Sequence, residues 1–112
     1  MSTTQIVPLV LAMPVADTTA GAATAIVGLE NVYAVIHGPV TDGHYYLQSS
    51  DAYGVTWVLE SEIGTIGPPA DLLTLAADEA EKWEVSETAY YLRIYRVSQG
   101  VGTPTGRIEG RI

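Results

Sequence analysis

Cysteine and early positive charge are the two things this chain of 112 residues lacks most clearly: it has no cysteine, and its first 81 residues contain neither lysine nor arginine. The absence of cysteine excludes a disulfide framework, thiol catalysis and cysteine-ligated zinc. The formal net charge of −8 at pH 7 repels a phosphate backbone, which nucleic-acid-binding proteins neutralise with lysine and arginine. We therefore expect no binding to nucleic acid or to an anionic membrane, and the scarcity of cations favours a protein partner.

Long uninterrupted apolar segments are also lacking. The apolar run at residues 6–16 is short and contains Pro8 and Pro14, and the stretch at residues 22–36 contains Glu30. A transmembrane helix needs about 20 consecutive apolar residues, so we expect no membrane span. No basic segment precedes the apolar run, as it would in a secretory signal. The sequence thus predicts a protein that acts where it is made, or in a particle assembled there.

Patterns typical of catalytic or metal sites are missing as well. No serine lies in a Gly-x-Ser-x-Gly context, and no glycine-rich phosphate loop ends in a lysine. His37 and His44 lie beside turn glycines with Asp42 and Asp51 nearby, but this spacing matches no pattern of metal ligands. We expect no enzyme, no cofactor and no metal site. A glycan-processing enzyme with paired carboxylates is a third interpretation, but the acidic run at residues 78–87 is more typical of a solvated surface.

Turn residues at short intervals indicate many short strands rather than long helices. Alternation places Tyr45 and Leu47 on one face of a strand and Tyr46 and Gln48 on the other, the pattern of a half-buried strand. The length fits one domain. We predict an all-β fold, a single β-sandwich or jelly-roll-like domain of about eight strands at residues 19–112, with an extended N-terminal arm at residues 1–18.

Strands are expected at residues 24–27, 31–36, 44–49, 55–61, 72–75, 88–97 and 106–112, with turns at 38–39, 41–43, 51–54 and 100–104 and a loop at 63–69. Residues 70–84 also carry apolar side chains at helical spacing. For this stretch we favour the strand followed by an acidic loop with one helical turn at residues 77–81. The last strand contains Ile108-Glu109-Gly110-Arg111, a protease recognition sequence used in cloning, which we interpret as a natural strand.

Two groups of residues are candidates for contact with a protein partner. The arm is apolar, and Asp17 is the single charge in the first 29 residues, so the arm is suited to lie across a neighbouring subunit. In residues 90–96, alternation separates a tyrosine–arginine face from an apolar one, and tyrosine and arginine are enriched at interface hot spots. That face is either a solvated ladder or a contact surface, and Arg93 and Arg96 are suited to pair with acidic groups of a neighbour. The partner-binding candidates are Ile6, Val7, Leu9, Val10, Leu11, Tyr91, Arg93 and Tyr95.

Two aromatic residues near the expected hairpin at residues 51–54 are candidates for ligand binding. Tyr53 at the tip and Trp57 after it are suited to stack on a sugar. The alternative for Tyr53 is a side chain folded back over its own hairpin.

Three segments resemble small β-sandwich proteins of tailed-phage virions. The segment Tyr45–Trp57 resembles their "strand, Ser-x-Asp-Gly-x-x-Trp, strand" hairpin, except that Ala52-Tyr53 stands before the glycine. The segment Val85–Ile94 is similar to the family's later strand, and Gly100–Pro104 to its closing turn.

The resemblance implies a non-enzymatic virion structural protein, assembled in the host cytoplasm. As a capsid decoration (cement) protein it would form a homo-oligomer, with a trimer favoured, and would stabilise the shell by binding the major capsid protein or another virion protein. The alternative that the resemblance implies is a carbohydrate- or receptor-binding module of a tail fibre or other tail appendage.

Overall fold

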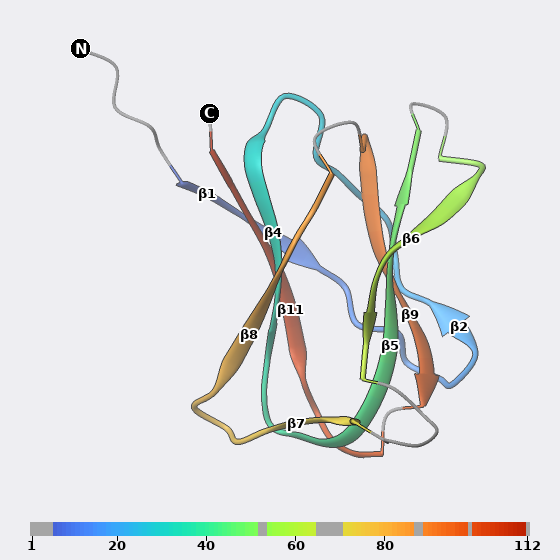
Figure 1. Ribbon diagram of the computed structural model, residues 1–112, viewed down its shortest axis with the longest axis vertical. Coiled ribbons are helices and arrows are strands. Elements are labelled where there is room, and N and C mark those ends of the chain that lie inside the picture. The colour runs from blue at the N-terminus through green and yellow to red at the C-terminus, as the bar shows by residue number, and fades with distance from the viewer. Residues whose placement is uncertain (1–5, 52–53, 65–70, 87–88, 99, 112) are drawn as a thin grey trace.

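The protein is a two-layer all-β sandwich in the computed structural model, which describes residues 6–51, 54–64, 71–86, 89–98 and 100–111 (Figure 1). Eleven strands lie within these ranges, and three of them, β2, β3 and β10, have only two residues each. The prediction of a β-sandwich is therefore confirmed, and the eight longer strands agree with the number expected.

The smaller sheet has four antiparallel strands in the order β1-β11-β4-β8. Their bounds are Ile6–Leu11 for β1, Thr105–Arg111 for β11, Glu30–His37 for β4 and Ala80–Glu84 for β8. The last strand, β11, lies between β1 and β4, and its Ile108 is completely buried. The Ile-Glu-Gly-Arg segment is thus an integral part of the sandwich.

The larger sheet is built around the long strand β5 (Val40–Ser50). Along one half of its length β5 pairs with β6 (Trp57–Ile63) and β9 (Tyr91–Ser98), and along the other half with β7 (Leu73–Leu75) and β10 (Val101–Gly102). The short strands β2 (Thr19–Ala20) and β3 (Thr24–Ala25) pair with the far side of β9. All these pairings are antiparallel.

The core lies between the two sheets and follows the predicted alternation. The larger sheet contributes Tyr45, Leu47, Leu92 and Ile94, each completely buried. The smaller sheet contributes Val32, Ala34, Ile36 and Ile108. Because the chain has no phenylalanine, tyrosine supplies the largest fully buried side chain, at position 45.

The turn expected at residues 41–43 is wrong. These residues continue β5, and the pairing of β5 with β7 shifts register between Val40 and Gly43, which marks a bulge. Asp42 has a φ of 59° there. Asp and Gly favour bulges for the same reason that they favour turns, namely tolerance of positive φ, so the sequence alone does not separate the two.

The acidic stretch after β7 also differs from expectation. The strand at residues 72–75 is confirmed as β7, but in place of a loop with a helical turn at 77–81 the chain forms β8. Pairing with β4 gives this segment a hydrogen-bonded neighbour that local sequence does not reveal. The acidic side chains Asp78, Glu79, Glu81 and Glu84 are exposed, as predicted.

Candidate functional site

The outward surface of β6, β5 and β9 gathers most of the aromatic and polar side chains that the sequence singles out. Cross-strand register places Trp57, Ser50 and Tyr91 in one row. The next row contains Leu59, Gln48 and Arg93, and the third contains Glu62, Tyr46 and Tyr95. We call this surface the tyrosine–arginine face and define it by Tyr46, Gln48, Trp57, Tyr91, Arg93 and Tyr95, all of which are half-buried.

Arg93 lies at the centre of the tyrosine–arginine face and is held on two sides. Its Nε donates a hydrogen bond to Oε1 of Gln48 at 2.7 Å. Its Cζ lies 4.1 Å from the centroid of the Trp57 ring, a cation–π contact. Burial lowers the pKa of the Arg93 guanidinium from its ordinary value. The guanidinium is therefore fixed in one orientation before any partner arrives, which reduces the entropy lost on binding.

A second ladder continues across the same face. The rings of Tyr46 and Tyr95 stack with centroids 6.1 Å apart and an interplanar angle of 19°. His44 meets the Tyr46 ring edge-on at 5.3 Å, and its Nε2 lies 3.2 Å from Oε1 of Glu62. These contacts make the face a rigid surface of rings and polar groups, suited to binding a protein surface.

Arg96 has a different environment from Arg93. Its Nε donates to Oδ1 of Asp17 at 2.6 Å, and its Nη1 to the carbonyl oxygen of Pro14 at 3.3 Å. The single charge of the first 29 residues is thus paired within the chain, and it fixes the segment after β1 to β9. An ion pair from Arg96 to a neighbouring subunit would have to compete with this contact.

The candidate residues of the arm fall into three environments. Leu11 is 1% exposed and belongs to the core, Leu9 is half-buried against the core, and Val10 is 76% exposed. The backbone of Ile6 and Val7 continues β1 in its pairing with β11, and their side chains lie outside the described part of the structure. From residue 6 onward the arm is therefore a strand of the domain's own sheet.

The two candidate ligand-binding residues are separated in what the structure describes. Tyr53 lies outside the described residues. Trp57 lies on the tyrosine–arginine face, where the Arg93 guanidinium already covers one face of its ring. Stacking of a sugar on that ring face would require displacement of Arg93.

The histidines take part in local contacts. Nδ1 of His37 lies 2.9 Å from the carbonyl oxygen of Gly38, and His44 contacts Glu62. Within the described ranges no three His, Asp or Glu side chains gather in a way that would hold a metal ion. Nor do those ranges contain a helix of the length and apolarity that crossing a bilayer requires.

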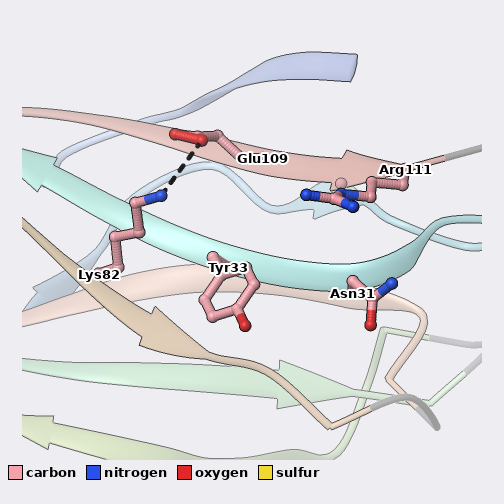
Figure 2. Close-up of a pocket in the computed structure, with 6 residues that line it drawn as sticks. Asn31, Tyr33, Lys82, Glu109 and Arg111 are labelled. Atoms are coloured by element: carbon pink, nitrogen blue, oxygen red, sulfur yellow. Dashed lines mark ion pairs between the residues drawn. The ribbon is translucent and has the colours of Figure 1, made fainter. Parts of the chain in front are cut away.

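A small pocket lies on the opposite surface of the molecule, on the smaller sheet, where Lys82 extends toward Glu109 above Tyr33 (Figure 2). Nζ of Lys82 lies 3.8 Å from Oε2 of Glu109 and 5.7 Å from the centroid of the Tyr33 ring. Asn31 and Arg111 complete the rim. Its volume of about 70 Å³ is far below the several hundred Å³ of typical small-molecule sites, so we do not assign it a ligand.

Sequence reasoning missed the role of Gln48 and Tyr46 on the tyrosine–arginine face. Alternation assigns both to the face opposite Tyr45 and Leu47, which is correct. The sequence does not show that β5 pairs with β9 in the register that brings Tyr46 to Tyr95. The structure therefore unites Trp57 with Tyr91, Arg93 and Tyr95, two groups that the sequence treats separately.

Comparison with known proteins supports the fold. No protein-family model matches the chain, and no curated protein matches it significantly. The chain is similar to the crystal structure of the SPBc2 prophage-derived protein YomS, with 18% sequence identity and a TM-score of 0.57. The match covers 100% of this chain and 97% of that chain. At this level of identity the likeness establishes the fold alone: the whole chain adopts an architecture that a prophage-derived protein also adopts.

Proposed function

We propose that the protein is a non-enzymatic structural protein of a tailed-phage virion, a capsid decoration protein that self-associates and binds the shell. The observation that carries the proposal is the tyrosine–arginine face, a preorganised outward surface in which Arg93 is held between Gln48 and Trp57. The full-length likeness to the SPBc2 prophage-derived protein YomS supports the phage context. The resemblance of the Tyr45–Trp57 hairpin to virion proteins supports it independently.

The proposed mechanism is passive stabilisation of an assembled shell. Burial of apolar surface contributes about 25 cal/mol per Å², less the entropy of association. Interface hot spots are enriched in tryptophan, tyrosine and arginine, and the tyrosine–arginine face presents all three. A preformed rigid surface loses less entropy on binding than a set of mobile side chains, so repeated weak contacts around a shell become sufficient.

The first test is composition of the particle. Mass spectrometry of virions assembled by the phage that encodes the chain should find the protein at a copy number comparable to that of the major capsid protein. Its absence from purified virions would overturn the proposal.

The second test concerns the face itself. Arg93→Ala should weaken binding to shells that lack the protein by about 2 kcal/mol, roughly thirtyfold in Kd. The matched control is Arg107→Ala, which removes the same side chain from the outward face of the smaller sheet. Equal binding by both variants would exclude the tyrosine–arginine face, whereas retention of a glycan by the isolated protein would favour the carbohydrate-binding alternative.

A further inference from the structure

The edges of the two sheets differ in how they are protected against pairing with another chain. Natural proteins protect exposed edge strands with charges, proline or very short strands. Edge strand β8 carries charged residues throughout, and β2 and β3 have only two residues each. In β1, Pro8 lacks an N–H group, and the hydroxyl of Thr24 donates to the carbonyl oxygen of Val10 at 2.9 Å. These edges all show recognisable protection.

Strand β6 is the exception. It has seven residues, and within the described part of the chain its only ladder partner is β5. Its first three residues, Trp57-Val58-Leu59, are uncharged, and Val58 and Leu59 are 56% and 57% exposed. An uncharged, exposed edge of this kind is a template for an added strand.

The printed backbone bonds of β9 determine which groups of β6 are free. Amides of Ile26, Gly21 and Thr18 donate to the carbonyl oxygens of Tyr90, Ile94 and Arg96, so the even-numbered residues of β9 direct their backbone away from β5. In an antiparallel sheet successive residues direct their backbone to opposite sides. The odd-numbered residues of β9 therefore bond to β5.

The same alternation extends to β6. Residues 46, 48 and 50 of β5 pair with the odd-numbered residues of β9, which leaves residues 45, 47 and 49 to bond to β6. Val58 pairs with Ser49 and is therefore bonded within the sheet. The N–H and C=O groups of Trp57 and Leu59, on either side of Val58, point outward from the edge.

This arrangement is complementary to itself. If a second copy lies antiparallel with Val58 opposite Val58, then Trp57 of each copy lies opposite Leu59 of the other. Both residues of each such pair have outward backbone groups, as a hydrogen-bonded pair requires. In this register Glu60 lies opposite Thr56 of the second copy, so no carboxylate faces another.

We propose that two copies of the chain pair through β6, with Val58 on the two-fold axis, and join their larger sheets into one continuous sheet. The Trp57–Leu59 pairs are aromatic–aliphatic cross-strand contacts, and they lie on the tyrosine–arginine face. That face thereby becomes continuous across the dimer. The proposal deepens the self-association part of the proposed function, and a protein that is monomeric but present in virions would overturn only the pairing through β6.

The chain has no cysteine, which makes cross-linking a direct test of register. At the two-fold axis Val58 forms a non-hydrogen-bonded pair with Cα atoms about 4.5 Å apart, within the range for a disulfide. The matched control is Leu59→Cys, at an equally exposed neighbouring position whose two copies would be roughly 8 Å apart. Under mild oxidation Val58→Cys should form covalent dimers about tenfold faster than Leu59→Cys. Equal rates would overturn the register.

Mass measurements on the unmodified chain test the pairing itself. Light scattering should give a dimer, and Val58→Lys, which places two ammonium groups side by side, should shift it to monomer. Val101→Lys, at an exposed position in β10, should leave the dimer intact. Because each copy carries a net charge of −8, added salt should strengthen the dimer. A monomer at all concentrations, a trimer, or a Val58→Lys dimer would overturn the proposal.

Discussion

Replacement of Tyr45 by phenylalanine tests whether its buried hydroxyl destabilises the sandwich. The side chain is completely buried, and its hydroxyl has no hydrogen-bond partner among the described residues. An unsatisfied buried polar group costs about 1–3 kcal/mol. Phenylalanine keeps the ring and removes that cost, so Tyr45→Phe should raise the free energy of unfolding by about 1 kcal/mol and Tm by about 4 °C.

The same substitution has a signature at high pH. Burial raises the pKa of Tyr45 above its ordinary value of 10.0, with a smaller opposing effect from Arg96. Above pH 10 the unfolded chain therefore loses this proton while the folded chain keeps it, so stability falls as pH rises. This contribution is fully present below pH 10 and is absent in Tyr45→Phe. The advantage of the variant should consequently widen above pH 10.

Urea denaturation followed by tryptophan fluorescence, at pH 7 and at a series of pH values above 10, measures both effects. Tyr46→Phe is the matched control, because Tyr46 is the adjacent residue on the outward face, and its effect should stay within about 0.5 kcal/mol. A loss of 1 kcal/mol or more in Tyr45→Phe at pH 7 would refute the reasoning, since it would mean that the hydroxyl is satisfied in the folded protein.

Three further predictions concern the packing of the two sheets. Ile108→Ala should lower the free energy of unfolding by about 3 kcal/mol in urea titrations, because Ile108 is fully buried in the central strand β11; a loss below 1 kcal/mol would contradict that placement. Asp17→Asn should cost at most about 1 kcal/mol, an effect that 1 M salt should largely remove, because Asp17 is 55% exposed in its pair with Arg96; a loss that salt leaves unchanged would contradict the ion pair. The protease specific for Ile-Glu-Gly-Arg should leave the native protein intact and remove Ile112 only after unfolding, as mass spectrometry would show, because β11 pairs on both sides.

The candidate site was predictable in part. Alternation correctly assigned Leu92 and Ile94 to the core and Tyr91, Arg93 and Tyr95 to the outward face. Strand β6 was predicted as half-buried, yet Val58 and Leu59 are both exposed, because this end of the strand lies at a sheet edge and its pairing with β5 shifts register near residue 60. Edge position depends on which strands pair, and local sequence does not encode it.

By itself, the sequence determined the all-β class, the sandwich and the alternation of its strands, because side chains with a period of two sort themselves between core and solvent wherever the strand lies. It also determined the charge asymmetry that disfavours nucleic acid. Only the tertiary structure decided that Asp17 pairs with Arg96, that Trp57 and Arg93 stack, and that β6 is the unprotected edge. These contacts join residues far apart in the chain, and they follow from strand order and register, which emerge only when both sheets pack around one core.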